Sequence, residues 1–274
     1  MTEKRDRVER AKMVVRGAIC GDIIGSAYEF DSTKDYDFEI FKEGSEFTDD
    51  TVCTIAVADA LIHDFPFDST LQSWGRRYHD VGYGGTFFRW LLLEEPYPYN
   101  SWGNGSAMRV SPAGAMARSE EEALDLSARS ASVTHNHPEG IKGAQSVALA
   151  IYMALEGRSK EEIKDEIERR FGYDLSRDYE KIKATYTFDV SCQGSVPEAI
   201  IAFLGSEDYE SAVRRAVALG GDADTQGTIA RSIAAAYYGS IPDYILEGCM
   251  SLLTAEIDDV INDFDNLLEE RDGR

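Results

Sequence analysis

The hydrophobic and polar positions of this chain repeat with the period of an α-helix. In the segment Arg7–Tyr28, apolar residues return every three or four positions, and Gly17, Gly21 and Gly25 fall within the same stretch. This pattern predicts a helix that lies close to another helix. The same periodicity predicts further helices at about 50–63, 69–80, 85–93, 105–117, 120–132, 139–156, 160–170, 197–204, 208–219, 224–238 and 243–269.

The remaining segments have the composition of connections. The stretches EEPYPYN, THNHPEG and SIPD carry the proline, glycine and asparagine residues of turns. One segment, ATYTFDVSC at 184–192, has the β-branched and aromatic alternation of a short strand. No low-complexity linker or internal repeat divides the chain. We therefore expect an all-α, multi-helix fold that forms a single domain over residues 1–274.

Charge and cysteine content narrow the function classes. The chain has a formal net charge of −22, which disfavours binding to nucleic-acid backbones and to anionic membrane surfaces, and which helps to concentrate divalent cations. The four cysteines lie far apart, with no CxxC pair, so neither a zinc ribbon nor a disulfide framework is indicated. The first residues lack the apolar stretch of a leader, and no apolar run is long enough to span a bilayer. We expect a cytoplasmic protein.

Two acidic clusters stand immediately before predicted helices. The stretch EFTDDTVCT contains Thr48, Asp49 and Asp50, and the stretch GGDADTQGT contains Asp222, Asp224 and Thr225. Such residues cap helices and suit their positive ends, so two independent caps would explain both clusters. If the two helix starts meet, they supply four carboxylates and two hydroxyls, which is enough for two bridged cations of the kind that prefers oxygen ligands.

Three further features are candidates for a site. Asp22 and Glu29 lie two helical turns apart on one face of an otherwise apolar helix, where an acid is costly unless it is paired, hydrogen-bonded or bound to a metal. The stretch SWGNG precedes a predicted helix and fits either an anion cradle or a tight turn. His135 and His137 lack a third zinc ligand nearby, so a substrate contact by one histidine is the better interpretation.

Taken together and in this order, these stretches resemble the ADP-ribosylglycohydrolase family, in a bacterial or phage form. The similarity is carried by GAICGDIIGSAYEF, FTDDTVCTIAVADAL, GNGSAMRVSPAG, VTHNHPEGIKGA, SVPEAIIAF and ALGGDADTQGTIARSIAAAYYG. It implies an all-α orthogonal bundle with two Mg²⁺ or Mn²⁺ ions in a central cleft. It also implies hydrolysis of the glycosidic bond that joins ADP-ribose to a protein side chain or small molecule, with ADP-ribose as the product.

The resemblance also assigns roles to residues. The positions that match metal ligands are Thr48, Asp49, Asp50, Asp222, Asp224 and Thr225. Glu29, Asp49 and Asp50 are the candidate acid–base residues. The positions that match the substrate-binding loop and a ligand-contacting histidine are Ser101, Trp102, Gly103, Asn104, Gly105 and His135.

One departure from the family pattern concerns the second cluster. Ala223 stands where threonine or serine is more common, and Gln226 and Gly227 replace a frequent small apolar pair. We expect metal binding to survive and acceptor preference to be affected. Two other functions stay open: a non-catalytic ADP-ribose-binding or crystallin-like structural member, and a dinuclear-metal nucleotide phosphohydrolase.

Overall fold

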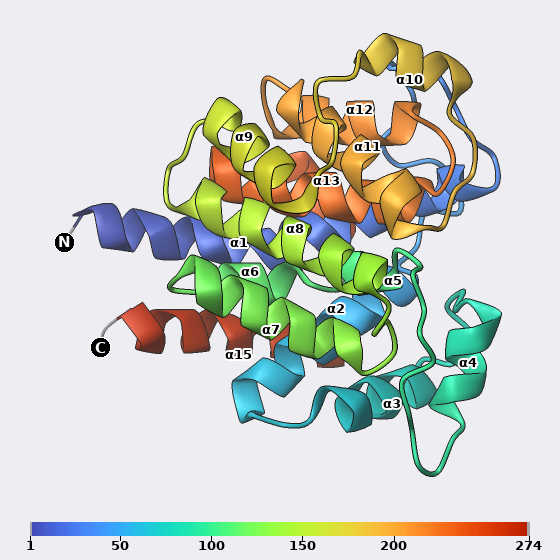
Figure 1. Cartoon of the computed structure of the whole chain (residues 1–274), viewed down its shortest axis with the longest axis vertical. Coiled ribbons are helices and arrows are strands. Elements are labelled where there is room, and N and C mark those ends of the chain that lie inside the picture. Colours follow the sequence, from blue (N-terminus) through green and yellow to red (C-terminus); the bar gives the residue numbers. More distant parts are fainter. Residues whose placement is uncertain (1, 273–274) are drawn as a thin grey trace.

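The computed structural model describes residues 2–272, and within them the side chains of residues 6–271. The described chain is built from helices (Figure 1). They are α1 (Thr2–Glu29), α2 (Asp49–His63), α3 (Phe67–Arg77), α4 (Gly85–Leu91), α5 (Gly105–Met108), α6 (Ser111–Met116), α7 (Glu120–Ser132), α8 (Pro138–Leu155), α9 (Lys160–Phe171), α10 (Tyr179–Thr185), α11 (Cys192–Leu204), α12 (Tyr209–Ala218), α13 (Ala223–Tyr238), α14 (Asp243–Met250) and α15 (Ala255–Asp272).

The antiparallel pair of α1 and α13 forms the centre of the fold. A methyl group placed on Gly21 would lie 2.6 Å from the carbonyl of Gly227, and one placed on Gly25 would lie 2.4 Å from the carbonyl oxygen of Ala223. The two backbones therefore approach so closely that only glycine fits at these crossings. The glycine spacing predicted this close approach, which sets the end of α1 beside the beginning of α13.

The other helices surround this central pair. Helices α8, α11 and α12 pack against α13, whereas α15, α6, α14 and α2 pack against α1. Figure 1 shows α1 and α13 crossing the middle of the molecule, with α3 and α4 at one edge and α10 and α12 at the opposite edge. Within residues 2–272, no helix is long and apolar enough to cross a bilayer.

Several predicted elements were wrong in type or extent. Residues 184–192 form no strand: α10 ends at Thr185, an extended segment follows, and a single bridge joins Gly103 to Ser191 before α11 begins. The predicted helix 105–117 is divided into α5 and α6. The predicted helix 243–269 is divided at Thr254, whose carbonyl accepts the amide of Asp258 in the first turn of α15. Helix α11 begins before Pro197, which lies inside it.

Candidate metal and substrate site

The first acidic cluster forms the beginning of α2. Thr48 precedes the helix in an extended conformation, and its hydroxyl oxygen accepts the amide of Asp50 at 3.2 Å. The same hydroxyl donates to a carboxylate oxygen of Asp22 at 2.7 Å. A threonine hydroxyl has one proton and two lone pairs, so one lone pair of Thr48 stays available to a ligand. Thr48 is thus a cap and a potential ligand at once.

Asp22 organises this helix start from α1. Its carboxylate also accepts the amide of Thr48 at 2.8 Å and the amide and hydroxyl of Thr51 at 3.0 and 2.5 Å. Asp22 is fully buried, and a buried carboxylate is tolerated when hydrogen bonds satisfy its oxygens. Of the alternatives open for this acid, the structure supports a hydrogen-bonding residue that fixes a neighbouring segment.

The second acidic cluster forms the beginning of α13. Gly220 and Gly221 both adopt positive φ, at 70° and 83°, and their turn delivers Asp222 to the start of the helix. Asp222 accepts a hydrogen bond from the side-chain amide of Asn104 at 2.6 Å. No side-chain capping bond is made by Asp222 in the described structure. Its carboxylate therefore does not serve as an ordinary helix cap.

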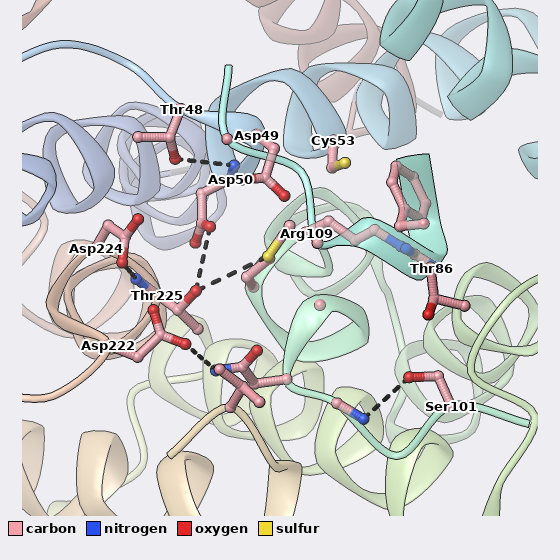
Figure 2. Close-up of a pocket in the computed structure, with 18 of the residues that line it drawn as sticks. Thr48, Asp49, Asp50, Cys53, Thr86, Ser101, Arg109, Asp222, Asp224 and Thr225 are labelled. Carbon is pink, nitrogen blue, oxygen red and sulfur yellow. Dashed lines mark hydrogen bonds between the residues drawn. The ribbon is translucent and has the colours of Figure 1, made fainter. Parts of the chain in front are cut away.

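The two clusters meet in one place. The hydroxyl of Thr225 donates to Asp50 Oδ2 at 3.1 Å, which connects the start of α13 to the start of α2 (Figure 2). Carboxylate oxygens of Glu29, Asp222 and Asp224 lie within 4.8 Å of one another, which is close enough for them to share one metal ion. The two helix starts thus face one common space, which two independent caps would not require.

Burial and mutual repulsion dominate the electrostatics of this space. Burial, reinforced by neighbouring aspartates, raises the pKa values of Asp49, Asp50 and Asp224 well above their ordinary range. Burial raises the pKa of Asp222 to about 6, and burial together with the charges of Asp224 and Asp22 raises the pKa of Glu29 to about 8. Like charges held this close favour either bound protons or a bound cation.

The carboxylates form one wall of a pocket of about 460 Å³. Ser101, Gly103, Asn104 and Gly105 line it from the loop before and within α5, and His135 lines it from the turn before α8. Figure 2 shows Ser101 and Thr86 on the far side of the space from Asp222 and Asp224. A volume of this order is typical of sites for small molecules.

The ring of His135 is held in one orientation beside the loop that contains Gly103 and Gly105. Burial lowers the pKa of His135 well below its ordinary range, so the ring is neutral at pH 7. The buried guanidinium of Arg109 donates to the hydroxyl oxygen of Thr134 at 2.8 Å, and that hydroxyl lies 2.7 Å from Nδ1 of His135. Whichever of these two atoms donates, the bond holds the ring with Nδ1 towards Thr134 and Nε2 towards Gly103 and Gly105.

The Gly-Asn-Gly stretch packs around this ring. A methyl group on Gly105 would lie 3.3 Å from Nε2 of His135, and one on Gly103 would lie 3.6 Å from it. Neither glycine has positive φ, so the backbone conformation does not require glycine at either position. They leave room for the histidine ring and for whatever binds above it.

Comparisons with known proteins agree with this architecture. The family model described as ADP-ribosylglycohydrolase matches residues 3–274. The chain belongs to the ADP-ribosylglycohydrolase family. It is 27% identical to the ADP-ribosylhydrolase ARH3 of Homo sapiens, over 88% of this chain and 89% of that protein. It is 26% identical to the ADP-ribosylarginine hydrolase Tri1 of Pseudomonas putida (strain GB-1), over 85% of this chain and 71% of that protein.

A solved structure supports the fold. The chain matches a structure described as an ADP-ribosylglycohydrolase-related protein complex with a TM-score of 0.74 and 23% sequence identity, over 96% of this chain and 99% of that one. The all-α prediction is confirmed. The predicted activity, enzymatic hydrolysis that removes ADP-ribose from an acceptor, is confirmed at the level of the family.

Not every predicted residue of this family site reaches the pocket. The side chain of Trp102 is half exposed and is absent from the pocket lining, while its carbonyl accepts the amide of Cys192 at 2.9 Å. Gln226 and Gly227 also lie outside the lining, and Gly227 is required at the crossing with Gly21. Gly227 therefore serves helix packing, and neither position contributes to the pocket lining.

Pocket residues without a role in the sequence analysis come mainly from three places. Gly82, Gly84, Gly85, Thr86 and Phe87 lie in and after the loop before α4, and the glycine-rich sequence GYGGT was a signal that could have revealed it. Tyr99 precedes the Ser101 loop. Phe188 and Val190 have no motif around them, and Phe30 ends the stretch GAICGDIIGSAYEF without having been given a role, so only their position in the fold brings these residues to the pocket.

The acidic cluster fits a divalent cation. Asp50 Oδ1 is buried and makes no hydrogen bond within the described residues, although buried carboxylate oxygens normally have a partner. The surrounding donors are carboxylate and hydroxyl oxygens, which are the ligands that hard divalent cations prefer. An unpartnered oxygen among these donors fits the role of a metal ligand.

Proposed function

We propose that the enzyme holds two divalent cations, Mg²⁺ or Mn²⁺, and hydrolyses the glycosidic bond between the distal ribose of ADP-ribose and its acceptor. Thr48, Asp49, Asp50, Asp222, Asp224 and Thr225 would hold the cations. When bound, the cations would fix the ribose hydroxyls and lower the pKa of the attacking water. The observation that carries the proposal is the meeting of two acidic helix starts in one pocket, joined by the Thr225–Asp50 hydrogen bond.

The protein side chains would supply the proton transfer. Glu29 is half buried at the end of α1, next to Asp222 and Asp224, which places its carboxyl group beside the cluster where the bond would break. We propose that Glu29 gives a proton to the leaving acceptor or takes one from water. Asp49 and Asp50 are the other candidates for this role.

The opposite wall would bind the rest of ADP-ribose. Ser101 accepts the amide of Gly103 at 3.1 Å, which shapes the loop, and the bond between Thr134 and Nδ1 orients the His135 ring so that Nε2 lies beside Gly103 and Gly105. Neutral polar groups of this kind suit diphosphate and ribose oxygens. The pocket volume of about 460 Å³ is in the range of sites for ligands of this class.

The direct test is a panel of ADP-ribosylarginine, ADP-ribosylserine, an ADP-ribosylated nucleobase and O-acetyl-ADP-ribose, incubated with Mg²⁺ or Mn²⁺. We expect release of ADP-ribose from at least one conjugate, with loss of turnover in EDTA and recovery on adding metal. Release of inorganic phosphate instead would favour the phosphohydrolase alternative. Binding of ADP-ribose without turnover would favour a non-catalytic member.

The Asp224→Asn variant tests whether the cluster is responsible. We expect it to lose turnover by about 100-fold or more, because a carboxylate ligand is replaced by a weaker neutral one. The matched control is Asp263→Asn, which removes an exposed carboxylate from α15. Full activity of Asp224→Asn in the presence of EDTA would overturn the proposal.

A further inference from the structure

An exposed aromatic pair stands at the edge of the pocket, beside the acidic cluster. The Phe30 side chain is 88% exposed and that of Phe188 is 50% exposed, although both line the pocket. Their rings are stacked, with centroids 6.4 Å apart and planes inclined by 24°. Exposed apolar groups that gather at the mouth of a pocket generally mark a binding surface. Neither ring is needed for the hydrophobic core.

The fold fixes both rings next to the carboxylates. Phe30 directly follows Glu29, which reaches the cluster because Gly25 allows α1 to contact the start of α13. The segment that carries Phe188 lies directly on the turn before Asp222: a methyl group on Gly221 would lie 3.4 Å from the Cα of Phe188. The pair therefore borders the place where the glycosidic bond would lie.

Lys34 fastens the two segments to each other. Its ammonium group donates to the carbonyl oxygens of Tyr186 and Leu219, just before Phe188 and Asp222 in the chain. Burial lowers the pKa of Lys34, and the nearby charge of Lys183 lowers it further. The rim of the pocket, formed by Phe30 and Phe188, is thus held in place by the hydrogen bonds of Lys34. The charge of Lys34 is directed at carbonyl groups.

We propose that Phe30 and Phe188 form the acceptor subsite and that they select a planar cation, the guanidinium of an ADP-ribosylated arginine. This inference rests on the proposed function. If the distal ribose lies at the cluster and the rest of ADP-ribose follows the Ser101 loop, the rim beside Glu29 is left for the acceptor. A guanidinium stacks on aromatic faces and is attracted by nearby carboxylates, whereas a serine acceptor offers no plane to stack.

The test compares conjugates in the metal-loaded enzyme. We expect the double variant Phe30→Ala/Phe188→Ala to lower kcat/KM for ADP-ribosylarginine by about 3- to 30-fold, the range expected for cation–π contacts. Its kcat/KM for ADP-ribosylserine and its Kd for ADP-ribose should change by less than about 2-fold, because neither ligand has a guanidinium. Both side chains are exposed, so the variant should fold normally.

Two control variants sharpen the result. Phe30→Leu/Phe188→Leu keeps apolar surface but removes the aromatic faces, and we expect it to behave like the alanine variant. Phe65→Ala removes a phenylalanine that is 54% exposed and outside the pocket lining, and it should have no effect. Full activity of the leucine variant on ADP-ribosylarginine would overturn stacking as the cause.

Other outcomes of this comparison also decide whether Phe30 and Phe188 bind the acceptor. An equal loss for all conjugates and for ADP-ribose would show that the rim binds the common ADP-ribose part, and a loss confined to the nucleobase conjugate would show that it binds a base. Either result overturns the proposal. If the wild type hydrolysed no conjugate, the proposed function would fail. The subsite would then be tested by calorimetry, comparing the Kd of intact ADP-ribosylarginine in the wild type and the double variant.

Discussion

The two helix starts that form the acidic cluster carry the same residue types but are held in different ways. The start of α2 is held by side-chain hydrogen bonds, from the Thr48 cap and from Asp22 on α1. The start of α13 lacks a side-chain cap bond in the described structure and is held by close backbone packing at Gly25. The start of α2 is thus fixed mainly by side-chain hydrogen bonds, and the start of α13 by close backbone packing together with the Asn104–Asp222 and Thr225–Asp50 bonds.

This difference explains how the carboxylates stay directed at one space. An ordinary cap would turn a side-chain oxygen onto the amides of its own helix, as the hydroxyl of Ser159 does in α9 and the carboxylate of Asp208 does in α12. In α2 the cap is made by Thr48, so the Asp50 carboxylate is not needed as a cap and accepts the hydroxyl of Thr225 at the start of α13. In α13 no cap is made by Asp222, and the repulsion among the acids is tolerated because the α1–α13 contact holds them. This repulsion lowers the stability of the region around the two helix starts, and in return the carboxylates can serve as a binding site.

The largest effect should follow from removing one carboxylate from each start. We expect Asp50→Ala and Asp224→Ala each to lower kcat/KM by at least about 1000-fold, because each removes a ligand of a shared metal site. Combining them should cost little more than either alone, since residues that act as a unit are not additive. Steady-state kinetics with the conjugate that the wild type hydrolyses fastest would measure this. Additive losses would mean that the two starts act separately.

The next effect concerns the polar support of α2. We expect Asp22→Ala to lower the free energy of unfolding by about 2–4 kcal/mol, because buried amides and hydroxyls of Thr48 and Thr51 lose their acceptor. Asp22→Asn keeps an acceptor oxygen and should lose less. Urea unfolding would measure both. Equal stability of Asp22→Ala and the wild type would show that the start of α2 does not depend on this carboxylate.

A smaller effect is expected from the packing support of α13. A methyl group at Gly25 would lie 2.4 Å from the carbonyl oxygen of Ala223, so Gly25→Ala must displace the start of α13. We expect a loss of about 1–3 kcal/mol, typical of overpacking, together with a smaller rise of Tm on adding Mg²⁺ than in the wild type. A thermal scan with and without metal would measure this. An unchanged response to metal would show that the position of Asp224 tolerates the shift.

The sequence predicted the packing support of α13 better than the polar support of α2. The glycines of α1 have helical spacing, so a close contact with another helix was visible, and the acidic helix starts were visible as well. That the two starts meet was not visible from spacing, because it depends on a contact between residues as distant as Asp50 and Thr225. The single-domain and cytoplasmic assignments stay predictions.

The segment around Phe188 shows why local pattern failed. Its β-branched and aromatic residues predicted a strand, but its backbone pairs with the Ser101 loop through two bonds, from Asn104 to the Val190 carbonyl and from Cys192 to the Trp102 carbonyl. Those two bonds fix an extended segment without extending into a ladder. The exposed aromatic residues that resemble a strand face therefore lie at the pocket instead, where sequence alone gave them no role.

The smallest effect should have opposite signs at the two starts. Thr48→Ala removes the cap of α2 and should lower stability by about 1 kcal/mol in EDTA. Asp222→Asn removes a buried like charge but keeps an oxygen to accept the Asn104 amide, so it should raise stability in EDTA by about 1 kcal/mol, or about 2 °C in Tm. The same variant should lose stabilisation by Mg²⁺. A fall in Tm for Asp222→Asn in EDTA would show that Asp222 contributes to folding as an ordinary cap, and that the contrast between the two starts is smaller than their hydrogen bonds suggest.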